Sequence, residues 1–317
     1  MVAASVAGCG SASKTAKSSS GGVEKANLTI GAIQSVSAAG LYIAEQRGLF
    51  AQQGLHVTIQ ATASSGTSMT TLLSGAQDIS FGNYVSYILA QDKHTADLKI
   101  IAPGYDSGPH GFEVLAPRGS PLIGNPQKLR GKTIGVNALN NIAVLLIEAK
   151  LKMEGVPLNS VKFVAYPFPE MAQALAEHRI DAGWETEPYL TDAESVYGDG
   201  EVFDSDDNGG TQNFPISGYA ITASFAKKYP KTVAAFVRAI TKAQQIATSD
   251  IGAVQAVLPK YTGIPAKVAN VISIGTFPTV VAPAELNRVT ALLQQLGWTP
   301  SQFNVGPMID DVSQSHG

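Results

Sequence analysis

The sequence predicts an α/β protein with two similar lobes, each a mostly parallel sheet flanked by helices. Three observations support this fold class. Short apolar runs of strand length alternate with longer stretches of helical periodicity, and the order strand, helix, strand, helix, strand occurs twice. The 317 residues are also enough for two domains of modest size. Because a helix returns the chain to the edge where the previous strand began, this alternation favours parallel strands.

The first unit lies in the first third of the chain. Its expected strands are short apolar or alternating runs, at 28–33, 55–60, 78–81 and 98–102. The helices expected between them cover 38–50 and 68–74. Ser37 stands where it can cap the first of these helices, and Gly48 lies near its end.

The second unit repeats this order after Pro117. Its expected strands lie at 132–136, 161–165 and 180–184. Its expected helices lie at 142–153 and 171–178. A strand that opens on an aspartate occupies corresponding places in the two units, with Asp78 in the first and Asp181 in the second. This correspondence is the reason for expecting two similar lobes.

The last third of the chain is mainly helical and returns to the first lobe. We expect a strand and two long helices there, at 217–222, 231–248 and 283–296. Crossover segments near 112–116 and 213–217 would form a two-stranded hinge, and a hinge makes a closable cleft. Lobe 1 is therefore expected to comprise 27–115 and 217–317, and lobe 2 to comprise 116–216.

The N-terminal segment carries a lipoprotein pattern. Val6-Ala-Gly-Cys9 places an aliphatic residue and two small residues before the only cysteine of the chain. Residues 1–8 are expected to be a truncated export-signal remnant, and 9–26 a lipidated cysteine followed by a flexible tether without apolar periodicity. A lipid on Cys9 would hold the body at the outer face of a membrane. The alternative is an ordinary N-terminal remnant with a free or buried thiol.

Composition and charge exclude several classes of protein. The formal net charge is −3, only 15% of residues are charged, and no basic stretch of the kind that binds nucleic acid occurs. No apolar run after residue 22 approaches the ~20 residues of a membrane span. A single cysteine permits no internal disulfide and no thiolate metal cluster. We expect a monomer without a cofactor or a metal.

Polar residues follow the expected strands and mark the expected ligand site. Ligands of open α/β sheets bind beyond the carboxyl ends of the strands. The candidate binding residues at these ends are Gln34, Ser35, Ser64, Ser65, Gly66, Thr67, Asn83, Tyr84, Asp106, His110, Asn137, Asn140, Asn141, Trp184, Glu185 and Glu187.

Two of these groups precede expected helices. Small hydroxyl residues with a glycine at 64–67 can expose N–H groups and side-chain donors to an anionic group of a ligand. Asn140 and Asn141 offer the same chemistry from the other lobe. In both places the alternative is simple capping of the helix that follows. For Trp184 and Tyr84 the alternatives are stacking on a flat ligand and packing inside a lobe.

The charges in these loops favour a ligand that carries an amine. None of the loops contains Lys or Arg, whereas Asp106, Glu185 and Glu187 are expected to face the same region together with His110. A desolvated ammonium needs a carboxylate partner, so a zwitterion or an amino-bearing heterocycle fits better than bare nitrate. Glu187 has a second interpretation, in which it only fixes its own loop through backbone N–H groups.

Other motifs carry little weight. Residues 204–209 resemble the first half of a calcium loop, but Pro215 stands where the bidentate glutamate belongs. The sequence has no nucleophile elbow, no phosphate-binding Gly-rich loop and no His-Glu-x-x-His motif, so no catalytic machinery is visible. A surface adhesion or sensor module would show a repeat or a large apolar surface, and neither is evident.

Five segments in order resemble one family of proteins. They are Leu41-Tyr-Ile-Ala-Glu-Gln-Arg-Gly-Leu-Phe50 with Gln53-Gly-Leu-His-Val57, then 72–79, Leu129-Arg-Gly-Lys-Thr-Ile-Gly-Val136, 180–188 and 229–236. This order resembles the solute-binding proteins for nitrate, taurine, aliphatic sulfonates and thiamine pyrimidine precursors. The resemblance implies a two-lobed periplasmic-binding-protein type II fold that delivers small molecules to an ABC importer. It also agrees with the lipoprotein pattern, because many members are lipoproteins.

We therefore expect an extracytoplasmic solute-binding lipoprotein. Its ligand would be taurine, an aliphatic sulfonate or an amino-bearing pyrimidine, and its partners an ABC permease and, through Cys9, membrane lipid. The alternatives are a nitrate or bicarbonate receptor of the same family, or an enzyme of thiamine pyrimidine synthesis on the same fold. The resemblance implies His and Cys clusters for such an enzyme, and this sequence lacks them.

Overall fold

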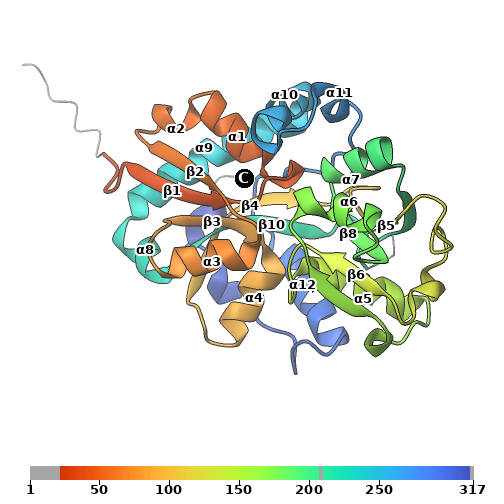
Figure 1. Cartoon of the computed structure of the whole chain (residues 1–317). Coiled ribbons are helices and arrows are strands. Elements are labelled where there is room, and N and C mark those ends of the chain that lie inside the picture. The colour runs from red at the N-terminus through yellow and green to blue at the C-terminus, as the bar shows by residue number, and fades with distance from the viewer. Residues whose placement is uncertain (1–21, 207–209, 315–317) are drawn as a thin grey trace, which may run out of the picture.

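The computed structural model describes residues 22–206 and 210–314, which form two lobes that lie side by side (Figure 1). Cys9, the expected signal remnant 1–8 and most of the tether 9–26 lie outside the described residues. No helix in the described part is both long and apolar enough to span a membrane. The predicted α/β class with two lobes is confirmed.

Lobe 1 is built on a five-stranded sheet in the order β2-β1-β3-β10-β4. Its strands are β1 (Asn27–Ala32), β2 (His56–Ala61), β3 (Ile79–Asn83), β4 (Leu98–Asp106) and β10 (Pro215–Thr222). β1 pairs in parallel with β2 and β3, whereas β10 runs antiparallel between β3 and β4. Four of the five strands therefore run in one direction, but the sheet is mixed, because the returning strand β10 pairs antiparallel with both of its neighbours.

Lobe 2 repeats this plan with the sheet order β7-β6-β8-β5-β9. Its strands are β5 (Phe112–Ala116), β6 (Thr133–Val136), β7 (Lys162–Ala165), β8 (Ala182–Thr186) and β9 (Gly200–Asp204). β6 pairs in parallel with β7 and β8, and β5 runs antiparallel between β8 and β9. In each sheet, only the strand that enters from the other lobe runs antiparallel to its two neighbours.

The helices flank these sheets. Those of lobe 1 are α1 (Ala39–Gln46), α2 (Leu49–Gln52), α3 (Ser65–Leu73), α4 (Tyr84–Asp92), α8 (Ala223–Lys228), α9 (Pro230–Ser249), α10 (Ile251–Thr262), α11 (Ala266–Ala269) and α12 (Pro283–Gln295). Those of lobe 2 are α5 (Ile142–Met153), α6 (Phe168–Ala176) and α7 (Tyr189–Asp192). Short 3₁₀ helices occur at Val36–Ala38, Pro126–Leu129, Leu158–Ser160, Gly306–Met308 and Asp311–Gln314, and a π-helical turn at Ala193–Tyr197.

The observed helices differ from the expected ones in two ways. The single helix expected at 38–50 is divided, because Gly48 has a φ of 64° and starts α2 in the left-handed region. Helices α4, α7, α8, α10 and α11 were not predicted. Nearly every residue of α4 is buried, so its sequence lacks a polar face.

The two lobes have the same hydrogen-bond arrangement at equivalent aspartates. Asp78 donates its N–H to the Thr29 carbonyl and accepts the Thr29 N–H on Oδ2, at 2.8 and 3.0 Å. Asp181 makes the same pair of bonds with Thr133, both at 2.9 Å. Each aspartate also holds a lysine, Lys25 or Lys132. The correspondence expected between the units is therefore present in their hydrogen bonds.

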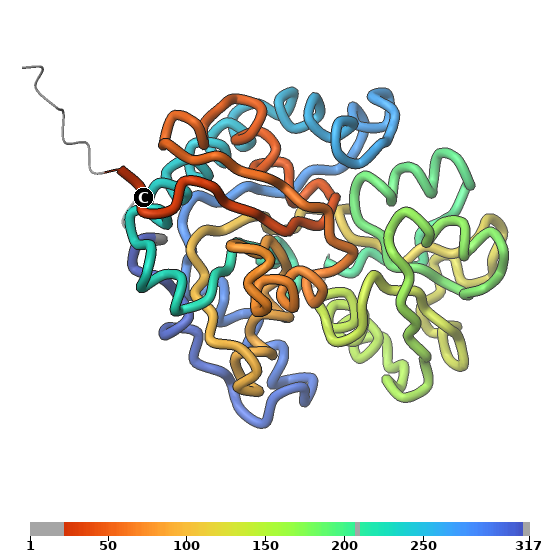
Figure 2. Tube along the Cα trace, turned by 60° about the vertical axis from the view of Figure 1, so that its left-hand side comes forward, coloured from red at the N-terminus to blue at the C-terminus, as the bar shows by residue number. Residues whose placement is uncertain are grey.

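The chain passes between the lobes twice. The first passage covers residues 107–111, and the second runs from Asp204 at the end of β9 to Pro215 at the start of β10. The expected boundaries at 115/116 and 216/217 thus fall inside β5 and β10, since each crossover segment became a strand of the lobe it enters. Ser107 joins the two passages through its N–H to the Phe214 carbonyl at 2.9 Å. The chain after β10 lies in lobe 1 in both views (Figure 2).

Candidate functional site

A cavity of about 40 Å³ lies between the lobes, at the carboxyl ends of β1, β3, β6 and β8. Side chains of both lobes line it: Ile33, Ser35, Ser37, Phe81, Gly82, Asn83, Phe112, Asn137, Ile142, Phe168, Trp184, Thr186, Ile216 and Ser217. No Lys, Arg, Asp or Glu is among these lining residues. The cleft is nearly closed, because this volume holds only one or a few water molecules.

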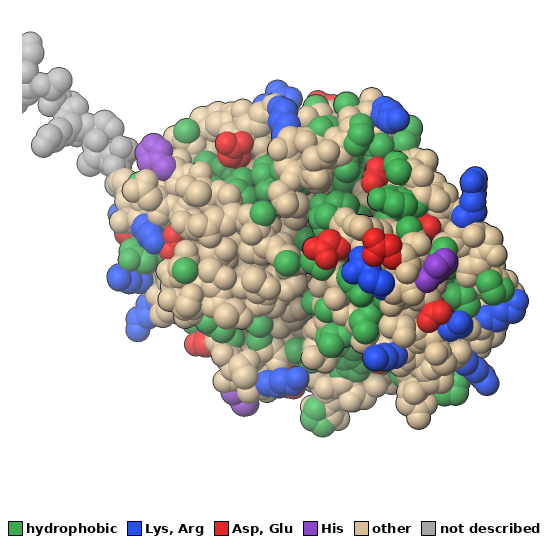
Figure 3. Space-filling view, in the orientation of Figure 1, with side chains coloured by type: hydrophobic (Ala, Val, Ile, Leu, Met, Phe, Trp, Pro, Cys, Tyr) green, Lys and Arg blue, Asp and Glu red, His purple; other side chains and the backbone are tan. Residues whose placement is uncertain are grey.

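A second hollow forms the outer part of the cleft. It measures about 210 Å³ and shares Ile33 and Phe168 with the inner cavity. Gln34 and Tyr189 also line it, from opposite lobes. Ile33 and Phe168 therefore stand between the inner cavity and the outer hollow. Uncharged side chains and backbone cover most of the face of lobe 1 seen in Figure 3.

Aromatic rings of lobe 2 form one wall of the cavity. Trp184 stacks on Phe112 with ring centres 5.2 Å apart and an interplanar angle of 24°. Phe168 lies against the same indole at 5.9 Å. The Trp184 Nε1–H donates to Ser205 Oγ at 3.0 Å, which holds the ring in its orientation. Trp184 therefore both packs within lobe 2 and presents a surface to the cavity.

Two buried hydroxyl groups of the lining lack a partner. Thr186 Oγ1 in lobe 2 and Ser217 Oγ in lobe 1 make no hydrogen bond with any described residue. Both residues are almost fully buried, at 2% and 3% exposure. Because buried polar groups are nearly always hydrogen-bonded, an unpartnered pair on opposite walls of one cavity needs an explanation.

Two amides in the lining are held by neighbouring side chains. Asn83 Nδ2 donates to Ser65 Oγ at 2.7 Å, and its Oδ1 accepts the Ser86 N–H at 2.9 Å. Asn137 Oδ1 accepts Nδ2 of Asn141 at 2.8 Å. These bonds orient one amide from each lobe at the cavity. Of the predicted residues, Ser35, Asn83, Asn137 and Trp184 are brought together here.

The predicted groups at the helix starts act mainly as caps. Ser64 Oγ accepts the Thr67 N–H at 3.2 Å, and Asn141 Oδ1 accepts the Ala143 N–H at 3.1 Å. Thr67 is exposed, Ser65 is engaged with Asn83, and Gly66 lies outside the cavity lining. Asn140 is exposed on a surface groove, with a φ of 54°. Ser64 and Asn141 therefore cap the helices that follow them, as the capping alternative held.

The carboxylates expected to face the ligand lie elsewhere. Trp184 and Thr186 line the cavity, so the alternation of β8 directs Glu185 to the opposite face of the sheet. Burial, with Asp199 next in effect, raises the pKa of Glu185 well above 4.5. Asp106 lies near α12, and burial raises its pKa to about 7. Tyr84 packs its hydroxyl against Gly218 inside lobe 1.

The argument for an amine-bearing ligand loses its basis, because neither Asp106, Glu185 nor Glu187 is part of the cavity lining.

Glu187 joins the two lobes. Its Oε1 accepts the Thr191 hydroxyl at 2.8 Å and the N–H of Ser273, which belongs to lobe 1, at 3.0 Å. Its carbonyl accepts the Val36 N–H at 2.9 Å, again from lobe 1. Burial raises the pKa of Glu187, although these hydrogen bonds oppose that effect. The residue fixes its loop, as the second interpretation held, and also fastens the closed cleft.

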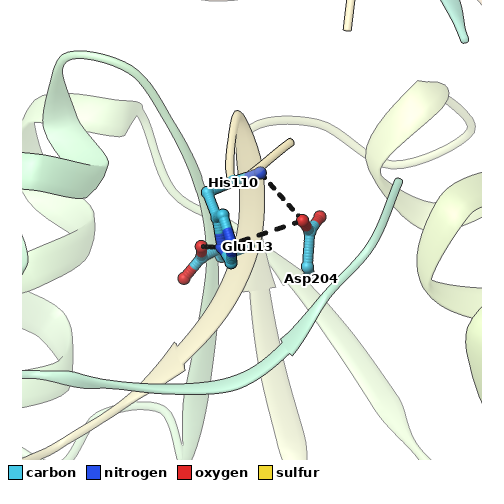
Figure 4. A group of neighbouring side chains, drawn as sticks. All are labelled: His110, Glu113 and Asp204. Atoms are coloured by element: carbon cyan, nitrogen blue, oxygen red, sulfur yellow. Dashed lines mark hydrogen bonds and ion pairs between the residues drawn. The ribbon is translucent and has the colours of Figure 1, made fainter. Parts of the chain in front are cut away.

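His110 lies in the first passage and outside the cavity. Its Nδ1 is 2.9 Å from Glu113 Oε1 and 3.9 Å from Asp204 Oδ2 (Figure 4). Gln34 donates its amide to the Tyr261 carbonyl at the rim of the cleft. Neither side chain contributes to the inner cavity.

Sequence reasoning missed most of the aromatic wall and both unpartnered hydroxyls. Thr186 could have been found, because it follows Trp184 by two residues on one strand and so shares its face. Ser217 had no such signal. It enters the site only because β10 inserts between β3 and β4.

Comparisons with known proteins give a family and a fold. The sequence pattern of a family described as NMT1/THI5 like matches residues 35–250. No curated protein matches the chain in sequence.

Solved structures share the two-lobed architecture. The alkanesulfonate-binding protein SsuA from Xanthomonas axonopodis pv. citri bound to MOPS is similar with a TM-score of 0.76 and 17% identity, over 90% of this chain and 99% of that one. The periplasmic nitrate-binding protein NrtA from Synechocystis PCC 6803 gives 0.73 and 16%, over 88% and 84%. A zinc-bound ligand-binding component of an ABC-type import system from Staphylococcus aureus gives 0.76 and 16%, over 90% and 97%. These likenesses confirm the periplasmic-binding-protein fold.

Proposed function

Because the chain belongs to the NMT1/THI5-like family, we propose that it is the extracytoplasmic receptor of an ABC importer and captures a small polar organic solute between its lobes. The observation that carries this proposal is the cavity at the carboxyl ends of the strands of both sheets. Thr186 Oγ1 and Ser217 Oγ meet there without partners, one from each lobe. Because the cavity in this structure holds only one or a few water molecules, the lobes must part to admit a solute. A solute that bonds to both hydroxyls would then hold the lobes together by contacting both of them.

The lining favours a flat, uncharged solute of the pyrimidine type over taurine or a sulfonate. Burying a charge without a partner is costly, and the lining residues supply none. The aromatic wall of Trp184, Phe112 and Phe168 offers a stacking surface. The hydroxyls and the amides of Asn83 and Asn137 suit ring nitrogens and exocyclic groups.

Delivery requires a permease and a place outside the cytoplasmic membrane. The solved structures similar to this chain include an import-system component and periplasmic binding proteins. The pattern ending at Cys9 supports a lipid anchor at the outer face of the membrane. Mass spectrometry of the protein from its membrane fraction tests the anchor. An acylated N-terminal peptide that begins at Cys9 supports it, and an unmodified thiol contradicts it.

The binding test uses calorimetric titration with a panel of aminopyrimidines, taurine, alkanesulfonates, nitrate and bicarbonate. Replacement of Trp298 by Phe leaves Trp184 as the only tryptophan, so quenching of its fluorescence reports stacking at the cavity. We expect binding and quenching by a pyrimidine-type solute. Binding of a sulfonate alone would refute the preference for an uncharged ligand, and no binding of any solute would remove support for the receptor.

A matched pair of variants locates the site. Thr186→Val removes the unpartnered hydroxyl in the cavity while keeping the shape of the side chain. Thr299→Val removes an equally buried and unpartnered hydroxyl that is not part of the lining. We expect the first variant to weaken binding about tenfold, the effect of one lost hydrogen bond, and the second to leave it unchanged. Equal affinities in the two variants would place the solute elsewhere.

A further inference from the structure

A histidine and two carboxylates converge where both passages meet lobe 2. His110 belongs to the first passage, Glu113 to β5, and Asp204 to the end of β9, directly before the second passage. One ligand atom of each lies within 4.8 Å of the other two. Figure 4 shows the Asp204 carboxylate directed at His110, with Glu113 beside the imidazole.

Backbone bonds hold this arrangement in place. The His110 N–H donates to Asp204 Oδ2 at 2.9 Å, and His110 adopts a left-handed φ of 57° to reach it. Strands β5 and β9 pair Glu113 directly with Asp204 across the sheet. The geometry thus places the three side chains independently of any ligand.

The buried carboxylates at this place are only partly compensated by partners. Glu113 is 3% exposed and its Oε2 makes no hydrogen bond with a described residue. Asp206 is 2% exposed, and its carboxyl lies close to the Asp204 carboxyl and to the Ser107 hydroxyl, without a hydrogen bond of good geometry to either oxygen. No Lys or Arg forms an ion pair with Glu113, Asp204 or Asp206 in the described part of the chain. Buried carboxylates are ordinarily paired or bound to a metal.

We propose that His110, Glu113 and Asp204 form a divalent cation site that fastens both passages to lobe 2. One imidazole with two carboxylates is a donor set that suits Zn²⁺ and similar transition-metal ions, whereas Ca²⁺ and Mg²⁺ prefer oxygen ligands alone. His110 Nδ1 lies 2.9 Å from Glu113 Oε1 and 3.9 Å from Asp204 Oδ2. These two separations lie on either side of the roughly 3.3 Å between ligand atoms of a tetrahedral ion whose bonds are about 2.0–2.1 Å long. Because the side chain of His110 is 63% exposed, the ion has a route from solvent.

This site is separate from the solute cavity. None of its three residues lines the cavity between the lobes. The sequence offers Asp204 only as part of an incomplete calcium loop, and chain folding gives it different partners, 94 residues away at His110. The proposed cation site is therefore independent of the proposed solute-binding function, and an experiment that refutes one of the two proposals does not refute the other.

The test measures Zn²⁺ binding to the full chain in a Cys9→Ser background, so that the thiol cannot bind the ion. Titration calorimetry and metal analysis after dialysis against ZnCl₂ give the affinity and the stoichiometry. We expect one Zn²⁺ per chain, no comparable binding of Ca²⁺ or Mg²⁺, and a higher unfolding temperature with Zn²⁺. Absence of Zn²⁺ binding, or equal binding of Ca²⁺, would overturn the assignment.

A matched histidine pair supplies the control. His110→Asn removes the imidazole but keeps a residue that tolerates the left-handed region. His94→Asn does the same at another exposed histidine, whose φ is 53° and which belongs to no such group. We expect His110→Asn to weaken Zn²⁺ binding at least tenfold and His94→Asn to leave it unchanged. Equal affinities would overturn the proposal, and circular dichroism confirms that both variants fold.

A second variant and a spectroscopic measurement keep the result independent of folding effects. Glu113→Gln removes one ligand charge at nearly constant shape and is expected to weaken binding by a similar factor. Co²⁺ in place of Zn²⁺ gives visible absorption bands that report its ligands. We expect these bands in the parent and in His94→Asn, and their loss in His110→Asn. Identical Co²⁺ spectra in all three would show that the ion binds elsewhere.

Discussion

Replacement of Glu185 by Gln should make the stability of the protein less sensitive to pH. Glu185 is fully buried on β8, and neither carboxyl oxygen has a hydrogen-bond partner among the described residues. Burial, followed by the charge of Asp199, raises its pKa well above 4.5. Between pH 4.5 and that raised pKa, the folded state binds a proton that the unfolded state has released. Stability is therefore greatest at low pH and falls as the pH rises through this window.

The magnitude follows from the proton balance. Each pH unit above 4.5 costs the folded state about 1.4 kcal/mol as long as the carboxyl stays protonated. Two such pH units amount to about 3 kcal/mol, a large part of the stability of an ordinary domain. A glutamine of the same shape cannot ionise and avoids this cost. Because its buried amide has a cost of its own, the slope of stability against pH is the decisive quantity.

The assay is urea unfolding at pH 5.5, 6.5 and 7.5, followed by circular dichroism. At pH values below the raised pKa, we expect the free energy of unfolding of the parent to fall by about 1.4 kcal/mol per pH unit relative to Glu185→Gln. Glu170→Gln, on the exposed side of α6, serves as the control and should follow the parent. Equal slopes in the parent and in Glu185→Gln would refute the reasoning. Solute affinity should not change in this variant, because Glu185 does not line the cavity.

Three further predictions address the cleft and the lobes. Glu187→Ala removes the bond to the Ser273 N–H between the lobes, so the ligand-free protein should open and its radius of gyration in X-ray scattering should rise; an unchanged radius would contradict this role. Ser65→Ala leaves two N–H donors of buried Asn83 without an acceptor and should cost about 1–3 kcal/mol in urea unfolding, whereas a loss below 0.5 kcal/mol would argue against it. Burial acts to raise the pKa of Asp181, but its hydrogen bonds outweigh burial and lower it, so its stabilisation is lost as the pH falls below about 4. Asp181→Asn should therefore flatten the loss of stability in acid, and an unchanged acid profile would exclude this contribution.

Local patterns predicted the elements more reliably than their boundaries. The 20-residue helix α9 appears almost where the periodicity from 231 to 248 placed it, with Pro230 at its first turn. The division of the expected helix at Gly48 depends on one left-handed residue, which periodicity cannot resolve. Helix α4 was missed because it is buried on nearly every side and therefore shows no amphipathic pattern.

The candidate site was predicted in position but only partly in its residues. The rule for open sheets located Ser35, Asn83, Asn137 and Trp184 at the cleft. The rule failed for Glu185, because it assigned every residue near the end of β8 to the cleft. Side chains alternate between the two faces of a strand, so Glu185 points away from the cavity that Trp184 and Thr186 line. Treating neighbouring residues as facing one region produced an acidic site that the alternation excludes.

Local sequence patterns are enough to predict the two repeated α/β units and the aspartate that opens one strand in each. These features depend on contacts between residues near one another or on the period of a single element, and one chain carries that information directly. Which side chains share the cavity, and which lie next to His110, depends on how the two lobes pack and cannot be predicted from these patterns. Thr186 and Ser217 are brought together by two sheets that close on each other, and His110 reaches Asp204 because both passages return to one edge of lobe 2. Contacts of this kind join residues far apart in the sequence and depend on the packing of whole lobes, which a local sequence pattern does not predict.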